Sequence, residues 1–197
     1  MRRQLRDKAT NTLWRDFLSA LLVLMSAGWF LVLPFSKEMA EDSLEENSPG
    51  QISVEVRWDD NLAVDIDTWM LSPGDLKPVG YSNTSGQVTN LLRDDLGHVS
   101  DFLGLNFENM YTRGMPPGEY IVNVHMYGPQ MFTAYPIKVK VVVMKRFVGK
   151  RAVSLFTKEV EIKRYGDEVT VIRFVLDDNG NVVSSNTLPK KLRSMPK

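Results

Sequence analysis

The stretch that decides the fold is ISVEVRW at positions 52–58, in which apolar and polar side chains alternate. Successive side chains of a β-strand point to opposite faces, so a period of two is typical of a strand with one buried face. Ile52, Val54 and Val56 share one face, and the polar residues between them share the other. The stretch therefore predicts a half-buried strand.

Stretches of similar character recur along the rest of the chain, separated by turns rich in Pro, Gly, Asp and Asn. The turn Asp177-Asp178-Asn179-Gly180 ends in Asn-Gly, a pair that suits a tight hairpin. About nine short strands at this spacing predict an all-β fold, an antiparallel β-sandwich over residues 51–186. Further strands are expected at Val64–Leu71, Pro78–Ser82, Phe102–Phe107, Tyr120–Tyr127, Ile137–Arg146, Val153–Arg164, Glu168–Leu176 and Asn181–Ser184.

Two passages of this region resemble a β-sandwich module found in bacterial secreted and surface proteins. An Asp-x-Asp strand at residues 65–69 precedes a Ser-Pro-Gly turn at residues 72–74. Further on, Glu108-Asn109 leads to a Pro-Pro-Gly-x-Tyr turn at residues 116–120 that opens a later strand. The function of that module is uncharacterised, so the resemblance implies the fold alone.

The composition excludes several classes of function. The 197 residues carry a formal net charge of +0, which removes the whole-chain argument for nucleic-acid binding. The chain has no cysteine, so disulfides, thiolate metal sites and cysteine nucleophiles are excluded. Hydrophobic residues make up 43% and charged residues 24%, as in an ordinary globular protein. We therefore expect one domain with an N-terminal appendage.

The appendage has the pattern of a membrane anchor. Residues 17–35 carry no charge, and a helix of about 19 residues is roughly 28 Å long, close to the roughly 30 Å hydrocarbon core of a bilayer. Residues 1–15 are rich in Arg and Lys, which favours a cytoplasmic N-terminus. The alternative, a cleaved signal peptide, fits less well, because Ser36, Glu38 and Ala40 do not form a good cleavage site.

These features predict a linear organisation in the bacterial inner membrane. A cytoplasmic basic tail (1–15) precedes a single transmembrane helix (16–36), an acidic linker (37–50) and a periplasmic sandwich (51–186). Residues 187–197 are expected to form a disordered basic tail.

Asp16 is an ionisable residue at the start of the apolar stretch, where a charge is costly and points to function. The sequence DFLSALLVLM at positions 16–25 resembles the transmembrane motif of the MotB/ExbD/TolR family of ion-driven motor subunits. The resemblance implies that Asp16 takes up and releases a coupling ion, H⁺ or Na⁺. Ser19 lies three residues on, near the same helical face, and is the second candidate for contact with that ion.

The resemblance also implies partners. Two copies of the helix would lie inside a pentameric ring of MotA/ExbB/TolQ-like membrane subunits, with the sandwich as the output domain facing an unidentified periplasmic or envelope partner. The alternative places Asp16 at the headgroup level, where it pairs with Arg15 or the helix N-terminus. The chain is then a membrane-tethered binding or adhesion module without ion transport.

The sandwich itself shows no pattern typical of an enzyme. No nucleophile elbow, glycine-rich phosphate loop or His-x-x-His spacing is present, so we expect neither catalysis nor an organic cofactor. His125 alternates with apolar residues on its strand and is expected to face solvent or a partner.

Several aspartates are candidate ligands for Ca²⁺, which prefers hard oxygen donors. The alternative is that these residues simply occupy turns and outward strand faces, and no spacing matches a defined calcium loop. The candidates are Asp65, Asp67, Asp94 and Asp95, within a wider set that adds Asp59, Asp60 and Asp101.

Overall fold

A computed structural model describes residues 14–28, 50–97, 104–128, 135–147 and 150–193. The chain divides into two units, Met1–Glu45 and Glu46–Lys197. In the first unit, residues 14–28 form a helix, and the rest of the predicted transmembrane segment lies outside the described residues. Within the described ranges, no helix has both the length and the hydrophobicity that crossing a bilayer requires.

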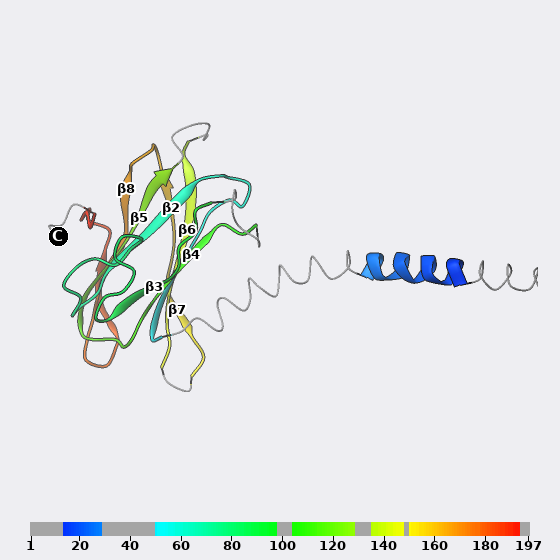
Figure 1. Cartoon of the computed structure of the whole chain (residues 1–197). Coiled ribbons are helices and arrows are strands. Elements are labelled where there is room, and N and C mark those ends of the chain that lie inside the picture. Colours follow the sequence, from blue (N-terminus) through cyan, green and yellow to red (C-terminus); the bar gives the residue numbers. More distant parts are fainter. Residues whose placement is uncertain (1–13, 29–49, 98–103, 129–134, 148–149, 194–197) are drawn as a thin grey trace, which may run out of the picture. The chain divides into compact units, whose positions relative to one another are not determined.

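The described part of the second unit contains nine strands in two antiparallel sheets (Figure 1). The five-stranded sheet has the order β3-β4-β1-β6-β7, and the four-stranded sheet has the order β2-β5-β8-β9. The predicted β-sandwich is thus confirmed as a fold class. The strands are β1 (Ile52–Arg57), β2 (Asp65–Leu71), β3 (Thr89–Arg93), β4 (Phe107–Thr112), β5 (Gly118–Gly128), β6 (Ile137–Lys145), β7 (Val153–Ile162), β8 (Glu168–Leu176) and β9 (Val182–Asn186).

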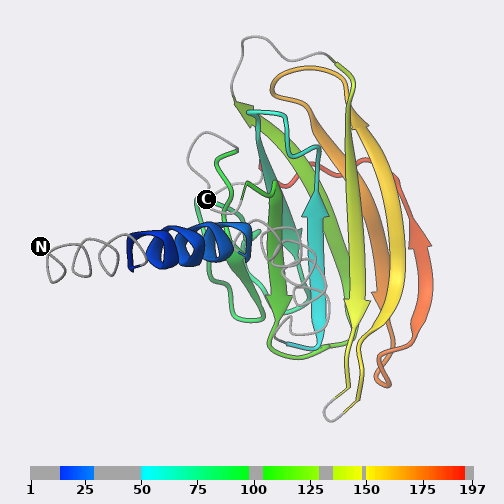
Figure 2. The same ribbon diagram turned by 90° about the vertical axis from the view of Figure 1, so that its right-hand side faces the viewer.

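The alternating stretch that forms β1 lies at the centre of the five-stranded sheet. In Figure 2, β1 is the cyan arrow between β4 in green and β6 in yellow-green. Val54 lies opposite Met110 of β4 and Val143 of β6, so apolar residues form a continuous row across the sheet. All three side chains are buried in the main core cluster. The polar face of β1 is also covered, since Ser53 and Glu55 are 6% and 2% exposed, so the expectation of a half-buried strand was wrong.

Two of the predicted strands are wrong. Residues 78–82 form only isolated bridges, such as that between Met70 and Val79. The structure has a strand at 89–93 instead, which the sequence pattern did not predict. The strand expected at 102–107 begins at Phe107 and continues to Thr112. The strands at 89–93 and 107–112 both contain buried polar side chains, such as Asn90 and Glu108, so the alternation of apolar and polar residues does not mark their two faces.

The Pro-Pro-Gly turn before β5 is fixed by its tyrosine. The Tyr120 hydroxyl donates to the Pro116 carbonyl oxygen, four residues upstream, at 2.7 Å. The Tyr120 ring stacks on Phe174 of β8 with ring centroids 5.0 Å apart. Gly118 has a φ of 132°, a conformation that other residues rarely adopt, and an added Cβ would lie 2.9 Å from Pro73. The turn therefore sets where β5 enters the core.

The chain after β9 differs from the disordered tail expected there. Residues 188–193, called the strap below, lie against the outer face of the four-stranded sheet, near the label C in Figure 1. Leu192 is 1% exposed and packs with Trp69 of β2 and Ile121 of β5. A buried leucine between two strands anchors the strap, whereas the basic composition alone indicated a solvated tail. Residues 194–197 lie outside the described residues.

Candidate metal centre

Glu108 connects the two sheets at the free edge of β2. On β4 it shares the inward face with Met110, so its carboxylate extends toward the opposite sheet. Its Oε2 atom accepts the backbone N–H of Thr68, at 2.5 Å. Because β2 is an edge strand, this amide has no neighbouring strand to pair with. The Glu108 side chain thus supplies the hydrogen-bond acceptor for a backbone N–H at the edge of the four-stranded sheet.

Three carboxylates converge at this edge. Asp67 comes from β2, Asp94 from the loop after β3, and Glu108 from β4, and one oxygen of each lies within 4.8 Å of the others. Calcium–oxygen distances are about 2.3–2.6 Å, so two oxygens on one Ca²⁺ are at most about 5 Å apart. The spacing is therefore compatible with a single ion held by all three groups.

Burial and mutual repulsion disfavour the ionised forms of these acids. Burial raises the pKa of Glu108 well above its usual range, and burial also raises the pKa of Asp67. The nearby Asp65 has its pKa raised from 3.8 to about 7, first by burial and then by the carboxylates of Asp67, Asp94 and Asp95. A bound cation would offset this repulsion and favour the ionised forms.

Two buried oxygens of the site have no hydrogen-bond partner among the described residues. They are Oε1 of Glu108, whose side chain is 1% exposed, and Oδ1 of Asp65, whose side chain is 9% exposed. Leaving a buried polar atom unsatisfied costs about 1–3 kcal/mol, and more for a charged group. An unsatisfied carboxylate oxygen within a group of acids is the arrangement that a cation ligand would satisfy.

His125 holds Asp67 in position from the neighbouring strand β5. Its Nδ1 lies 2.9 Å from Oδ2 of Asp67, and its Nε2 contacts a guanidinium nitrogen of Arg193 in the strap. A guanidinium only donates, so Nε2 is the acceptor and the ring proton on Nδ1 is donated to Asp67. His125 is 2% exposed, so the expectation that it faces solvent was wrong. The strap and β2 together cover it.

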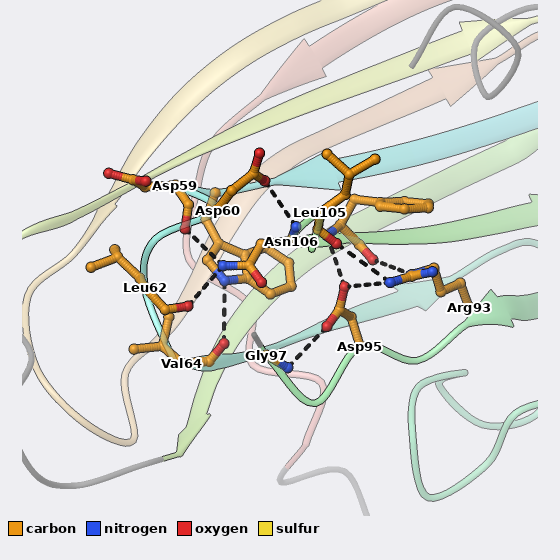
Figure 3. Close-up of polar contacts among 11 residues, drawn as sticks. Asp59, Asp60, Leu62, Val64, Arg93, Asp95, Gly97, Leu105 and Asn106 are labelled. Carbon is orange, nitrogen blue, oxygen red and sulfur yellow. Dashed lines mark hydrogen bonds and ion pairs between the residues drawn. The ribbon is translucent and has the colours of Figure 1, made fainter. Parts of the chain in front are cut away.

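Asp95, one of the predicted calcium ligands, has a structural role instead. Its carboxylate accepts bonds from Arg93 at 3.0 Å, from the Gly97 amide at 2.9 Å and from the Phe107 amide at 3.0 Å (Figure 3). These contacts fix the loop that presents Asp94 and tie it to the start of β4. Asp95 therefore positions the candidate ligand Asp94, while its own carboxylate oxygens accept hydrogen bonds from within the protein.

Asp59 and Asp60, from the wider set of candidates, also bond within the protein. Asp59 caps the following turn by accepting the Asn61 amide at 2.9 Å. Asp60 accepts the Asn106 amide at 2.9 Å, as Figure 3 shows. Asp101 lies outside the described residues. Of the four leading candidates, Asp67 and Asp94 belong to the group and Asp65 lies beside it.

The proposed ion-coupling residues lie on the helix of the first unit. Asp16 and Ser19 are both exposed there, and the Ser19 hydroxyl donates to the Arg15 carbonyl oxygen at 2.8 Å. The hydroxyl oxygen keeps lone pairs for a further contact. Ion binding by these residues stays a prediction.

Glu108 and His125 are the members of the site that the sequence did not reveal. The signal for Glu108 is its parity, since it stands two residues before Met110 and so shares the apolar face of β4. Recognising that signal requires the strand to be placed at 107–112 rather than at 102–107. His125 offers no such signal, because its neighbours on the outer face come from distant parts of the chain.

A scan against protein-family models, a search of curated proteins and a search of solved structures each returned no match. The resemblances noted in the sequence therefore stay predictions, and the function has to be inferred from the residues themselves.

Proposed function

We propose that this chain is a membrane-tethered, extracytoplasmic binding module whose β-sandwich holds a divalent cation of the calcium type. The observation that carries the proposal is Glu108, a buried carboxylate with one unpartnered oxygen, grouped with Asp67 and Asp94. Ca²⁺ accepts six to eight oxygen ligands in flexible geometry, so three carboxylates, Asp65 and water form a suitable donor set.

The cation would act by joining elements of both sheets, in addition to the hydrogen bond between the Thr68 amide and Glu108. Asp67 belongs to one sheet and Glu108 to the other, while Asp94 is exposed in the loop after β3. An ion shared by these groups would add a link between the edge of β2, β4 and the loop that Asp95 already anchors. We therefore propose binding rather than catalysis, with the ion ordering a surface for a periplasmic or envelope partner.

Two observations support the tether. Residues 17–35 carry no charge, and apolar side chains on the described helix are largely exposed: Leu22, Leu24 and Met25 are 68%, 70% and 67% exposed. Such a surface needs a lipid or protein environment. The basic N-terminal tail favours a cytoplasmic N-terminus. In the proposed topology, the helix crosses the bacterial inner membrane and the sandwich lies in the periplasm.

Calorimetric titration of the full chain in detergent with Ca²⁺ tests the cation site. We expect one Ca²⁺ per chain, and binding at least about tenfold weaker, or about 1.4 kcal/mol, in Asp94→Asn. Asp178→Asn is the matched control, because Asp178 is another exposed loop aspartate whose loss changes the net charge equally. Absence of Ca²⁺ binding in the wild type, or equal weakening by the control, would contradict the proposal.

Reporter fusions at Gly50 and Lys197 test the tether. Reporters that function only after export should be active at both positions, and the mature protein should keep residues 1–40. A mature N-terminus after Ser36 would show that the segment is a cleaved signal peptide.

A second function rests on Asp16 and the motif that follows it. In this alternative the chain is the single-helix subunit of an ion-driven motor, a homodimer within a MotA/ExbB/TolQ-like ring, and H⁺ or Na⁺ binds at Asp16 with Ser19 nearby. The observation that favours it is the carboxylate of Asp16 at the start of a charge-free stretch. Burial of this group within a ring of membrane subunits would make its ionised form energetically costly. A cation-stabilised sandwich is compatible with the role of output domain.

A further inference from the structure

The cation site and the strap meet on the outer face of the four-stranded sheet. Asp67, His125 and Glu168 lie directly opposite one another on β2, β5 and β8, forming one row across the sheet. Asp67 belongs to the proposed cation site at one end of the row, and Glu168 bonds the strap at the other. His125, between them, contacts Asp67 through Nδ1 and Arg193 of the strap through Nε2.

The strap is held by polar contacts to its backbone, by one apolar anchor, and by side-chain contacts of Lys190 with Glu119 and of Arg193 with His125. Glu168 Oε1 accepts the Leu192 amide at 2.6 Å. Thr170 Oγ1 accepts the Lys190 amide at 2.9 Å, and the Lys190 carbonyl oxygen accepts from Asn123 Nδ2 at 2.8 Å. Only the Leu192 side chain is buried beneath the strap. A short segment with a single anchor is the kind of element that can leave the surface without unfolding the sheets.

Electrostatic attraction contributes to the docking of the strap through Arg193. Arg193 donates a hydrogen bond to His125 Nε2, and Nδ1–H of the same imidazole ring donates a hydrogen bond to Asp67. The positive charge of Arg193 also favours the ionised form of Asp67 and offsets part of the increase that burial causes in its pKa. The carboxylate of Asp67 thus interacts with Arg193 of the strap, through His125, and also belongs to the proposed cation site.

We propose that the cation and the strap are negatively coupled: a cation bound at Asp67 weakens docking of the strap, and undocking of the strap raises affinity for the cation. The coupling rests on the proposed cation site. A divalent ion brings two positive charges to the carboxylate that attracts Arg193, so the attraction falls or becomes repulsion. Linkage requires the effect to be equal in both directions. Cation loading would therefore increase the fraction of molecules in which Trp69, Ile121 and the polar groups under the strap are uncovered.

The size of the coupling is modest because Arg193 is exposed. Exposed charge pairs contribute about 0.2–1 kcal/mol, which corresponds to a change in affinity of up to about fivefold. Removing the charge of Arg193 should therefore tighten Ca²⁺ binding by about two- to fivefold, and less in high salt.

The test compares Ca²⁺ titrations of the full chain in detergent for the wild type, Arg193→Gln and Lys191→Gln. Lys191 is the matched control, since it lies in the same strap, is exposed and makes no polar contact among the described residues. We expect tighter binding in Arg193→Gln and wild-type affinity in Lys191→Gln. Equal effects of the two variants would overturn the proposal, because general charge reduction would then explain the result.

Hydrogen exchange at the strap supplies an independent readout. Saturating Ca²⁺ should increase exchange of the Lys190 and Leu192 amides, which the sheet protects by hydrogen bonds, while the amides of β1 stay protected. Ca²⁺ binding without faster exchange would refute the coupling and leave the cation site intact. A chain that does not bind Ca²⁺ at all would refute the proposed function as well.

Discussion

The sharpest prediction concerns Glu108→Gln, which separates a cation ligand from a structural carboxylate. The substitution preserves the shape of the side chain and an oxygen acceptor for the Thr68 amide, but it removes the charge that a cation needs. Burial holds the pKa of Glu108 well above its usual range, so the cation-free site favours a neutral group. In chelator we therefore expect the free energy of unfolding to change by less than about 1 kcal/mol.

With Ca²⁺ the two proteins should diverge. Ligand at a hundredfold excess over Kd stabilises the folded state by about 2.7 kcal/mol, which for a unit of this length corresponds to roughly 5–11 °C in Tm. The wild type should gain this increment, and Glu108→Gln should gain little of it. Thermal unfolding of the full chain in detergent, followed by near-ultraviolet circular dichroism, measures both arms, with Asp178→Asn as the control.

Two outcomes would refute the reasoning. A loss of more than about 3 kcal/mol for Glu108→Gln in chelator would show that the charged carboxylate itself stabilises the fold. An equal increase of Tm with Ca²⁺ in the wild type and the variant would show that the ion binds elsewhere.

Three further predictions concern pH, the strap and the helix. The folded-state pKa of Asp65 is raised from 3.8 to about 7, so its protonated form contributes stability that is present below about pH 4 and lost as pH rises through 7. In chelator, the unfolding free energy of the wild type relative to Asp65→Asn should fall across this range; a rise would contradict the assignment. Leu192→Ala should lower the unfolding free energy by about 2 kcal/mol in denaturant titrations, at the low end for buried leucines because the strap can move; unchanged stability would mean that the strap is not docked. Asp16→Asn should abolish activity of an ion-driven complex while leaving expression and dimerisation intact, whereas Asp16→Glu keeps a titrating group and partial activity; full activity in the Asn variant would exclude the motor.

How well the strands could be predicted depended on what their side chains face. In β1 and β6 the apolar and polar residues alternate, and both strands lie within a residue or two of their predicted bounds. In β4 the polar residues Glu108 and Asn109 are adjacent, so residue types do not alternate between the two faces of the strand. Local pattern identifies a strand when its two faces carry different residue types, as in β1, even though both faces of β1 are buried.

Local sequence pattern was enough to predict the β-sandwich class and the charge-free N-terminal stretch, because both depend on residue types that are close together in the chain. It also offered Asp67 and Asp94 as candidate ligands, among seven aspartates that it could not rank by position in space. That Glu108 joins these two acids depends on the tertiary fold, because its carboxylate reaches the free edge of β2 from the opposite sheet. Likewise, the strap lies over His125 because Leu192 packs against Trp69 and Ile121, which belong to strands distant from it in sequence. Alternation tells which side chains share a face, but which faces and edges meet depends on the packing of the whole domain.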